Sequence, residues 1–307
     1  PSDILQMTAV TVPMLLTENK ALDPLDALRT IAITDGIPEL VRLFDFQRTF
    51  AENMGLLFTQ NSTYFRYAES ELRRHFRTPE TYNILLYGMA TGHNRISQLA
   101  EFSGFPQNKC DKYLKALDKA KLLETVQRKD TAGHVRTHYY PKGGYWKTWF
   151  RYVFPSQGRC LKPFEGDSLQ QLASDIDRSI VAEYFKKICW KWMKKNYGDY
   201  YWDEILGFDD PKQQDVTVNG VHFDYVQETK DHTIYVKIWD DIGEGFPKAE
   251  FQKIETVTTK NRPFYENIYF LFSAGRACNY VEQLRNLDTV AVVDLKSLLG
   301  QKNTGLF

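Results

Sequence analysis

The sequence predicts a multi-domain protein in which an all-α region precedes a mixed α/β region. Apolar residues recur at helical spacing through residues 21–78, and nothing there is sheet-like. Three more helical stretches and two strand-like runs follow within 79–140, and helical and strand patterns alternate within 168–307. These changes of pattern divide the chain into three segments, 1–78, 79–155 and 156–307.

The composition is that of an ordinary globular protein. The 307 residues suffice for two or three domains, and 43% of them are hydrophobic and 25% charged. No apolar run approaches the roughly 20 residues that span a bilayer, and no signal peptide opens the chain. The four cysteines lack CxxC spacing, which argues against a zinc site. We therefore expect a cytoplasmic protein without a membrane partner.

The first segment is predicted to consist of helices. Leu25, Leu28 and Ile31 share one helix face in "PLDALRTIAI". In "TDGIPELVRLFD" the helix breaks at Gly36 and restarts with Pro38 at a first-turn position. The helical pattern continues in "TFAENMGLLFTQ" and "TYFRYAESELRRHF".

Residues 79–140 predict a compact unit of three helices and a hairpin. Pro79 starts the first helix, Gly92 stops it, and Gly104 ends the second. The third helix is "PQNKCDKYLKALDKAKLLE", and "LETVQRKDTAGHVRTHYY" predicts two strands joined by a turn at Asp130–Gly133. This order is that of a winged helix-turn-helix, whose third helix would be the recognition helix.

Basic residues gather on the predicted third helix and hairpin. Cations at both places could neutralise phosphates on either side of a groove, so double-stranded DNA is the expected partner. The candidate DNA-binding residues are Asn108, Lys109, Lys112, Lys115, Arg128, Lys129 and Arg136. The same elements also carry Lys119, His134 and His138. The alternative is a protein-docking or packing module whose lysines form a solvated face.

Charge is segregated along a chain whose formal net charge is zero. Basic residues outnumber acidic residues in 79–160, and acidic residues outnumber basic residues in 198–260. The two blocks could bind each other, or the first could face a polyanion and the second a metal or a basic partner.

The remaining sequence predicts an aromatic helix followed by a small mixed α/β domain. Trp146, Trp149, Phe150 and Val153 fall at helical spacing, which indicates a packing helix rather than a base-stacking platform. The expected elements after it are a helix at 169–196, strands near 201–208, 221–228 and 232–239, a helix at 248–260, a strand in "NIYFLFSAG", a helix in "RACNYVEQL", and a strand and short helix in "DTVAVVDLKSLL". The first of these helices carries five lysines, which predict a solvated face or, alternatively, a stripe that contacts phosphates: Lys186, Lys187, Lys191, Lys194 and Lys195.

Several collinear stretches together resemble the C-terminal region of archaeal-type P-loop ATPases: "AITDGIPELVRLFD", "TFAENMGLLFTQ", the run from "NILLYGMATG" to "KLLETV", and "WFRYVFPS". The resemblance implies a lid segment, a winged helix and a restriction-endonuclease-like domain, and places Gly36 and Pro38 in the lid near the adenine. Asp35 stands where the family usually has a glycine. No GxxxxGK[ST] motif is present, so we expect no ATP hydrolysis, and ATP as a cofactor only with an upstream ATPase core. The chain is then the C-terminal part of such an ATPase or a relative without the core, and an ATPase core or another protein would be its partner.

The resemblance also implies a degenerate nuclease site of the PD-(D/E)XK type. Asp224 in "HFDYV", Lys237 in "IYVKIW" and Glu183 on the preceding helix match its pattern. Such carboxylates hold Mg²⁺ or Mn²⁺, and the lysine stabilises developing charge. The central acidic position is Tyr235, and a phenol is a poor ligand for a hard cation. Glu228, which shares strand parity with Asp224 and Val226, could replace that ligand only if the turn brought it back to the site.

We therefore expect a module that binds DNA or a partner protein and carries an inactive nuclease-like domain, with no certain cofactor. Two alternatives stay open. One is a metal-dependent DNA nuclease that uses Asp224, Lys237, Glu183 and Glu228, with Asp224 and Glu183 as metal ligands. The other is a protein-binding scaffold, in which Asp224 and Lys237 form an ion pair or a surface feature. Whether the chain is an enzyme is left open by its sequence.

Overall fold

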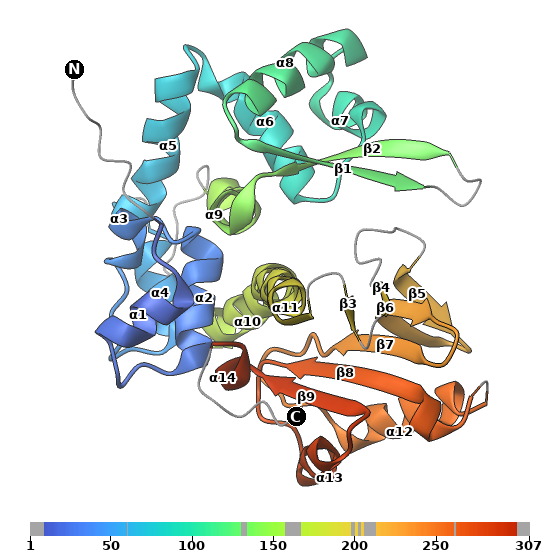
Figure 1. Ribbon diagram of the computed structural model, residues 1–307. Coiled ribbons are helices and arrows are strands. Elements are labelled where there is room, and N and C mark those ends of the chain that lie inside the picture. Colours follow the sequence, from blue (N-terminus) through green and yellow to red (C-terminus); the bar gives the residue numbers. More distant parts are fainter. Residues whose placement is uncertain are drawn as a thin grey trace, which may run out of the picture. The chain divides into compact units, whose positions relative to one another are not determined.

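The computed structural model describes residues 9–59, 61–129, 134–156, 167–197, 200–201, 204–205, 213–260 and 262–299. It is a mixed α/β structure (Figure 1). The chain divides into two compact units, Pro1–Met14 with Arg29–Ile176 and Leu15–Leu28 with Asp177–Phe307. The division into three segments stays a prediction. Within the described residues, every helix is too short or too polar to cross a bilayer.

The first segment is helical, as its periodicity predicts. Its helices are α1 Val12–Glu18, α2 Pro24–Thr34, α3 Pro38–Val41, α4 Phe50–Leu57 and α5 Thr63–His75. The backbone between α2 and α3 is left-handed at Asp35 and Gly36, with φ of 52° and 68°. Pro38 restarts the helix as expected, although α3 has only four residues. Thr49 and Glu52 form a capping box that fixes the start of α4.

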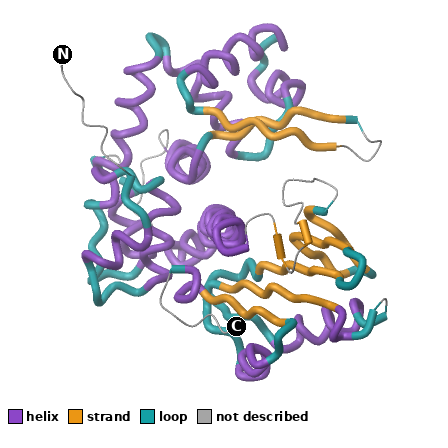
Figure 2. The backbone as a smooth tube through the Cα atoms, in the orientation of Figure 1, coloured by secondary structure: helices purple, strands orange, loops and turns teal. Residues whose placement is uncertain are grey.

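Three helices and an antiparallel hairpin follow in the predicted order (Figure 2). They are α6 Pro79–Ala90, α7 Ile96–Ser103, α8 Gln107–Lys119, β1 Leu123–Lys129 and β2 Val135–Pro141. Gly104 ends α7 in a left-handed conformation with φ of 71°. Buried Leu85, Leu99, Leu114 and Leu117 give the three helices a common core. The expected turn at Asp130–Gly133 lies outside the described residues.

The aromatic run packs in the interior, as predicted. It forms α9 Gly143–Thr148, a π-helix Trp149–Val153 and a 3₁₀-helix Phe154–Ser156. The Trp149 indole is fully buried and donates a hydrogen bond to the Phe65 carbonyl at 3.2 Å. Asp35 accepts hydrogen bonds from the backbone N–H groups of Gly144 at 2.7 Å and Tyr145 at 3.1 Å. Asp35 therefore connects the α2–α3 turn to the start of α9.

The C-terminal region is built on a five-stranded mixed sheet (Figure 1). Its elements are α10 Asp167–Ile176, a π-helix Asp177–Val181, α11 Ala182–Tyr197, β3 Tyr200–Tyr201, β4 Glu204–Ile205, β5 Gln214–Val218, β6 Val221–Glu228, β7 Thr233–Ile238, α12 Lys248–Thr258, a 3₁₀-helix Phe264–Glu266, β8 Asn267–Ser273, α13 Asn279–Gln283, a 3₁₀-helix Leu284–Asn286, β9 Val290–Asp294 and α14 Leu295–Leu298. The strand order is β5-β6-β7-β8-β9. Strand β6 pairs antiparallel with both β5 and β7, and β8 pairs parallel with both β7 and β9.

Two expectations for this region differ from the structure. A π-helix interrupts the α-helix that was expected at 169–196. Strand β5 was not predicted, although the sequence contains its signal. Asn219 and Gly220 have positive φ values of 47° and 84°, which is the two-residue turn that joins hairpin strands. A strand was expected near 201–208. Tyr201 and Glu204–Ile205 are in strands, and the other residues of this range lie outside the described part of the chain.

Helices α11 and α12 pack on opposite faces of this sheet. On β8, the ring of Tyr269 lies 5.9 Å from that of Phe251 in α12. The ring of the next residue, Phe270, lies 5.1 Å from that of Tyr197 in α11. Because successive strand residues point to opposite faces, each helix covers one face.

The side-chain alternation of β6 is interrupted beside Asp224. In a regular strand Asp224 and Val226 would share a face. Val226 packs against the core on the α12 side, but Asp224 contacts Lys186 of α11. The β5–β6 register is continuous across this position, so the change of side is a local departure from regular strand alternation. The expected shared parity of Asp224 and Val226 is therefore wrong, and Asp224 faces α11.

Candidate functional site

Asp224 is a buried carboxylate held by two partners. Asp224 lies in the middle of β6 and is only 5% exposed. One oxygen, Oδ2, accepts a hydrogen bond from the backbone N–H of Ile238 at 2.7 Å. The other oxygen, Oδ1, lies 2.7 Å from the ammonium nitrogen of Lys186. Both contacts give the carboxylate oxygens partners in a position where unpaired polar atoms would be costly.

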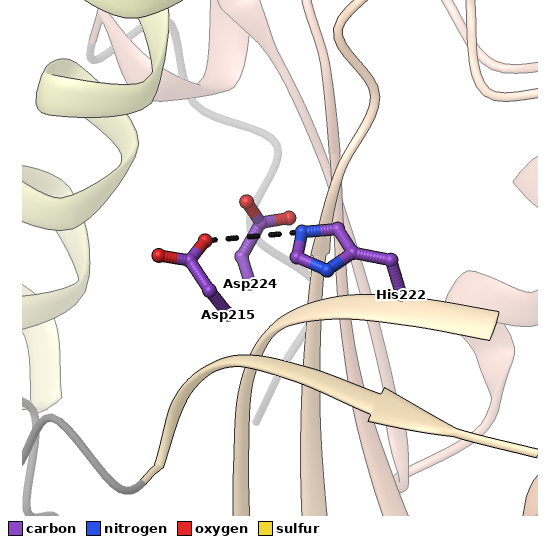
Figure 3. A group of neighbouring side chains, drawn as sticks. All are labelled: Asp215, His222 and Asp224. Carbon is purple, nitrogen blue, oxygen red and sulfur yellow. Dashed lines mark ion pairs between the residues drawn. The ribbon is translucent and has the colours of Figure 1, made fainter. Parts of the chain in front are cut away.

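Asp215 and His222 complete a cluster around this carboxylate (Figure 3). One ligand atom from each of the three side chains lies within 4.8 Å of the others. His222 Nε2 lies 3.8 Å from Asp215 Oδ1. Asp215 has φ of 51°, a left-handed conformation that favours glycine but is tolerated by aspartate. Two carboxylates and an imidazole are a suitable donor set for Mn²⁺ or Zn²⁺.

Lys186 already supplies a positive charge to this cluster. Its ammonium lies 3.2 Å from Asp215 Oδ1 as well as 2.7 Å from Asp224 Oδ1. Burial lowers the pKa of Lys186, but the carboxylates of Asp224 and Asp215 raise it more, so the net shift is upward. The lysine remains protonated at neutral pH and offsets one of the two negative charges. A metal ion on these residues would have to displace the Lys186 ammonium. Lys186 also departs from the predicted solvated lysine face of this helix.

Lys237 is directed to the other face of the sheet. Its ammonium lies 3.8 Å from Glu250 Oε1 on α12 and donates to the His222 carbonyl at 2.8 Å. Asp224 instead pairs with Lys186 on the α11 side. Lys237 and Asp224 therefore do not form the ion pair that the sequence suggested as one alternative. They belong to two separate groups of charged residues.

The other expected nuclease residues lie apart from the cluster. Glu183 pairs with Lys187 on the next turn of α11 at 3.1 Å and is 41% exposed. Glu228 is exposed at the last position of β6. Tyr235 is buried on the α12 side and stacks on Tyr269 with ring centroids 5.7 Å apart. Burial and then the Glu228 charge raise the pKa of Tyr235, so its phenol stays neutral.

The exposed side chains of α8 include the expected basic residues. Asn108, Lys109, Lys112, Lys115 and Lys119 are exposed. The ammonium of Lys109 lies 3.9 Å from the centroid of the Phe105 ring, and that of Lys115 lies 2.6 Å from Asp111 Oδ2. Both contacts involve exposed lysines at the surface, where they are weak.

The hairpin places two arginines directly opposite each other. Arg128 and Arg136 are cross-strand partners in the β1–β2 ladder, and both are exposed. The Arg128 guanidinium lies 5.7 Å from the centroid of the Tyr140 ring. Lys129 is the last residue of β1 and pairs in register with Val135. The two arginines therefore concentrate positive charge at this position of the hairpin.

Gly36 and Pro38 have local structural roles. A Cβ on Gly36 would lie 2.1 Å from the carbonyl oxygen of Val10, and the Gly36 carbonyl accepts a hydrogen bond from the Val10 N–H at 2.7 Å. Pro38 occupies the first turn of α3. Their place in a nucleotide lid stays a prediction.

Sequence reasoning missed Asp215, His222 and the role of Lys186 in the cluster around Asp224. The Asn219–Gly220 dipeptide was the available signal. A two-residue turn there pairs Val216 with Phe223 and Gln214 with Tyr225. This register sets Asp215 opposite Asp224.

Comparisons of the chain with protein family models, with curated proteins and with solved structures each found no match. The functional argument therefore rests on the residues and their geometry.

Proposed function

We propose that the chain binds double-stranded DNA through α8 and the β1–β2 hairpin, acting as a winged-helix module. The observation that carries this proposal is the cross-strand pairing of Arg128 with Arg136. The two guanidinium groups concentrate positive charge on one face of the hairpin. A phosphate backbone would attract both side chains.

The exposed residues of α8 support the same surface. Asn108, Lys112, Lys115 and Lys119 recur at helical spacing, so they form one stripe along the helix. The lysines would contact phosphates, and Asn108 is the polar side chain able to hydrogen-bond a base edge. In this proposal the phosphate contacts supply most of the affinity.

The arrangement around Asp224 supports an inactive nuclease-like domain. Lys186 contacts both carboxylates and occupies the place of a cation, and Lys237 pairs with Glu250 on the other face of the sheet. An ATPase core as the binding partner is part of the same proposal, and it rests only on the sequence resemblance.

A salt titration of duplex binding tests the proposed function. Fluorescence anisotropy of a labelled duplex is measured at salt concentrations from about 50 to 200 mM, the range over which phosphate contacts weaken steeply. We expect Lys112→Ala and Arg136→Ala each to weaken binding and to reduce the slope of log K against log salt by about 1. Lys253→Ala removes an exposed lysine from α12 and should leave both quantities unchanged.

A wild-type chain that shows no salt-dependent binding would contradict the proposal and favour a protein-binding scaffold. Equal losses in Arg136→Ala and Lys253→Ala would also contradict it, because binding would then depend on total charge alone.

Metal-dependent DNA cleavage is a second candidate function, favoured by the Asp215, His222 and Asp224 cluster. It requires a divalent ion to displace Lys186. Duplex cutting that needs Mn²⁺, stops with EDTA and is lost in Asp224→Asn would support it. Binding without cutting under the same conditions would retain recognition as the function.

A further inference from the structure

One face of the β1–β2 hairpin is rich in basic side chains. Arg128 and Arg136 are cross-strand partners, and His138 lies two residues beyond Arg136 on the same face. The opposite face is marked by side-chain hydrogen bonds between Gln127 and Thr137. His138 therefore has Arg136 beside it on its own strand and Arg128 diagonally across the ladder.

A third arginine reaches this face from the start of α7. The Asn94 side chain donates to the carbonyl of Tyr139 at 2.9 Å, and the Tyr139 N–H donates to the Asn94 carbonyl at 2.8 Å. These bonds bring Arg95, the next residue after Asn94, near His138, where its charge acts on the imidazole. We define the basic hairpin face as Arg95, Arg128, Arg136 and His138.

The acids nearest to this face are paired with lysines. Glu124, on the same face of β1, lies 3.7 Å from the ammonium of Lys147 in α9. Asp111 of α8 lies 2.6 Å from Lys115. The other titratable groups on β2 and on the helices packed against it are Tyr139, Tyr140, Glu80, Tyr82, Tyr87 and Tyr145. Among the described residues, no ion pair joins His138 to a carboxylate.

The neutral form of His138 is favoured in the free protein. Burial, then the charges of Arg128 and Arg95, lower the pKa of the His138 imidazole from 6.5. A phosphate oxygen near Arg95 and Arg128 would offset the repulsion that their charges exert on a protonated His138. It would also accept a hydrogen bond from the imidazolium, which is a donor at both ring nitrogens.

We propose that the basic hairpin face is a phosphate-binding site in which His138 takes up a proton when a phosphodiester of the duplex binds. This inference rests on the proposed function, since the duplex supplies the phosphate. Arg95, Arg128 and Arg136 carry fixed charge at every physiological pH. His138 adds a charge that depends on pH and on occupancy of the site.

The sign of the pH effect follows from the linkage of proton and phosphate. The bound phosphate raises the pKa of His138 above its value in the free protein. Binding therefore strengthens as pH falls through the pKa of the complex, and it levels off below the pKa of the free protein. One linked proton changes the affinity by at most about tenfold per pH unit.

The test measures duplex affinity from about pH 5.5 to 8.5 at constant ionic strength. The proteins are the full chain, His138→Gln, which cannot titrate, and His75→Gln, which removes a histidine at the end of α5. We expect the affinity of the full chain and of His75→Gln to rise on the order of tenfold between pH 8 and pH 6. In His138→Gln the rise should fall to about threefold or less. NMR titration of the His138 Cε1–H signal should show a higher pKa with duplex than without it.

Failure of this inference is distinguishable from failure of the proposed function. An unchanged pH slope in folded His138→Gln, or a His138 pKa that duplex does not raise, overturns the proton-linked site. Salt-dependent binding would still stand in that case. A wild-type chain that binds no duplex at any of these pH values overturns both proposals. Circular dichroism of His138→Gln checks that the variant is folded.

Discussion

At the scale of single residues, the Lys186–Asp224 pair determines whether the cluster of Asp215, His222 and Asp224 can bind a metal ion. A carboxylate at 5% exposure needs a compensating charge, and Lys186 provides it from α11. The same ammonium contacts Asp215, so one lysine satisfies two acids. Lys186 therefore offsets one of the two negative charges of the cluster without a metal ion.

Replacement of Lys186 by methionine is expected to destabilise the fold by about 2 kcal/mol. The value lies below the roughly 3–5 kcal/mol for breaking a fully buried pair, because the lysine side chain is 37% exposed. The pKa of Lys186 is raised above 10.5, so its contribution is present at every lower pH and is lost only as pH rises through the folded-state value. The cost should thus be constant from about pH 6 to 9 in urea unfolding experiments.

Lys187→Met is the matched control, because Lys187 is the next residue and pairs at the surface with Glu183. It should cost less than about 0.5 kcal/mol. Adding Asp224→Asn to Lys186→Met should recover part of the loss, because the unpaired charge is removed. Equal costs for the two lysine variants would contradict the assignment.

The cluster could not be predicted from the sequence because it depends on a local irregularity. Regular alternation assigns Asp224 to the side of Val226, and the strand departs from that alternation at Asp224. Lys186 has no distinguishing neighbour within the lysine-rich run of α11. The basic residues of α8, by contrast, were predictable as exposed because their spacing leaves Cys110, Leu114 and Leu117 on the buried face.

At the scale of elements, close backbone packing restricts the loops that follow the parallel strands. Gly245, between β7 and α12, lies against the segment after β8. A Cβ there would lie 1.7 Å from the Arg276 carbonyl oxygen. Gly220 has a different requirement, since its φ is 84° and a Cβ would meet nothing within 4 Å.

The two glycines predict different costs for the same substitution. Gly220→Ala should lower the free energy of unfolding by about 1–2 kcal/mol, the cost of a left-handed conformation in a residue with a Cβ. Gly245→Ala should cost about 3 kcal/mol or more, because two backbone segments must separate. Urea unfolding of both variants measures the difference. The reverse order of the two costs would contradict this account of the loops.

Most elements were predictable because local signals determine them. Pro79 and Gly104 mark helix ends that the structure reproduces. The π-helix at Asp177–Val181 has no such signal, because it depends on how the flanking helices pack. Strand β5 was missed even though Asn219–Gly220 is a strong hairpin signal. The run "QQDVTV" before that turn is polar and mostly exposed, and so lacks the apolar pattern of a buried strand.

At the scale of the whole molecule, a formal net charge of zero is combined with uneven charge along the sequence. Molecules with little net charge repel one another weakly, and opposite blocks attract between copies. The sequence pI is about 7.4, so the net charge is smallest near physiological pH.

Self-association at low salt is therefore expected to be greatest near pH 7.4 and to decrease on either side. Added salt should reduce it, because contacts between exposed charges are screened over about 10 Å at 0.1 M. Static light scattering at about pH 6, 7.4 and 9, with and without added salt, measures the effect. Association that is unaffected by salt would point to apolar contacts instead.

The arrangement of the five-stranded sheet also has a consequence for the order of folding. Strands β5, β6 and β7 are joined by short turns at Asn219–Gly220 and Thr229–His232. Strand β8 can pair with β7 only after α12 has crossed between them, and β9 needs a further crossover. Closing a short loop costs less chain entropy than closing a long one. The antiparallel half of the sheet is thus the expected nucleus, and the parallel half assembles on it later.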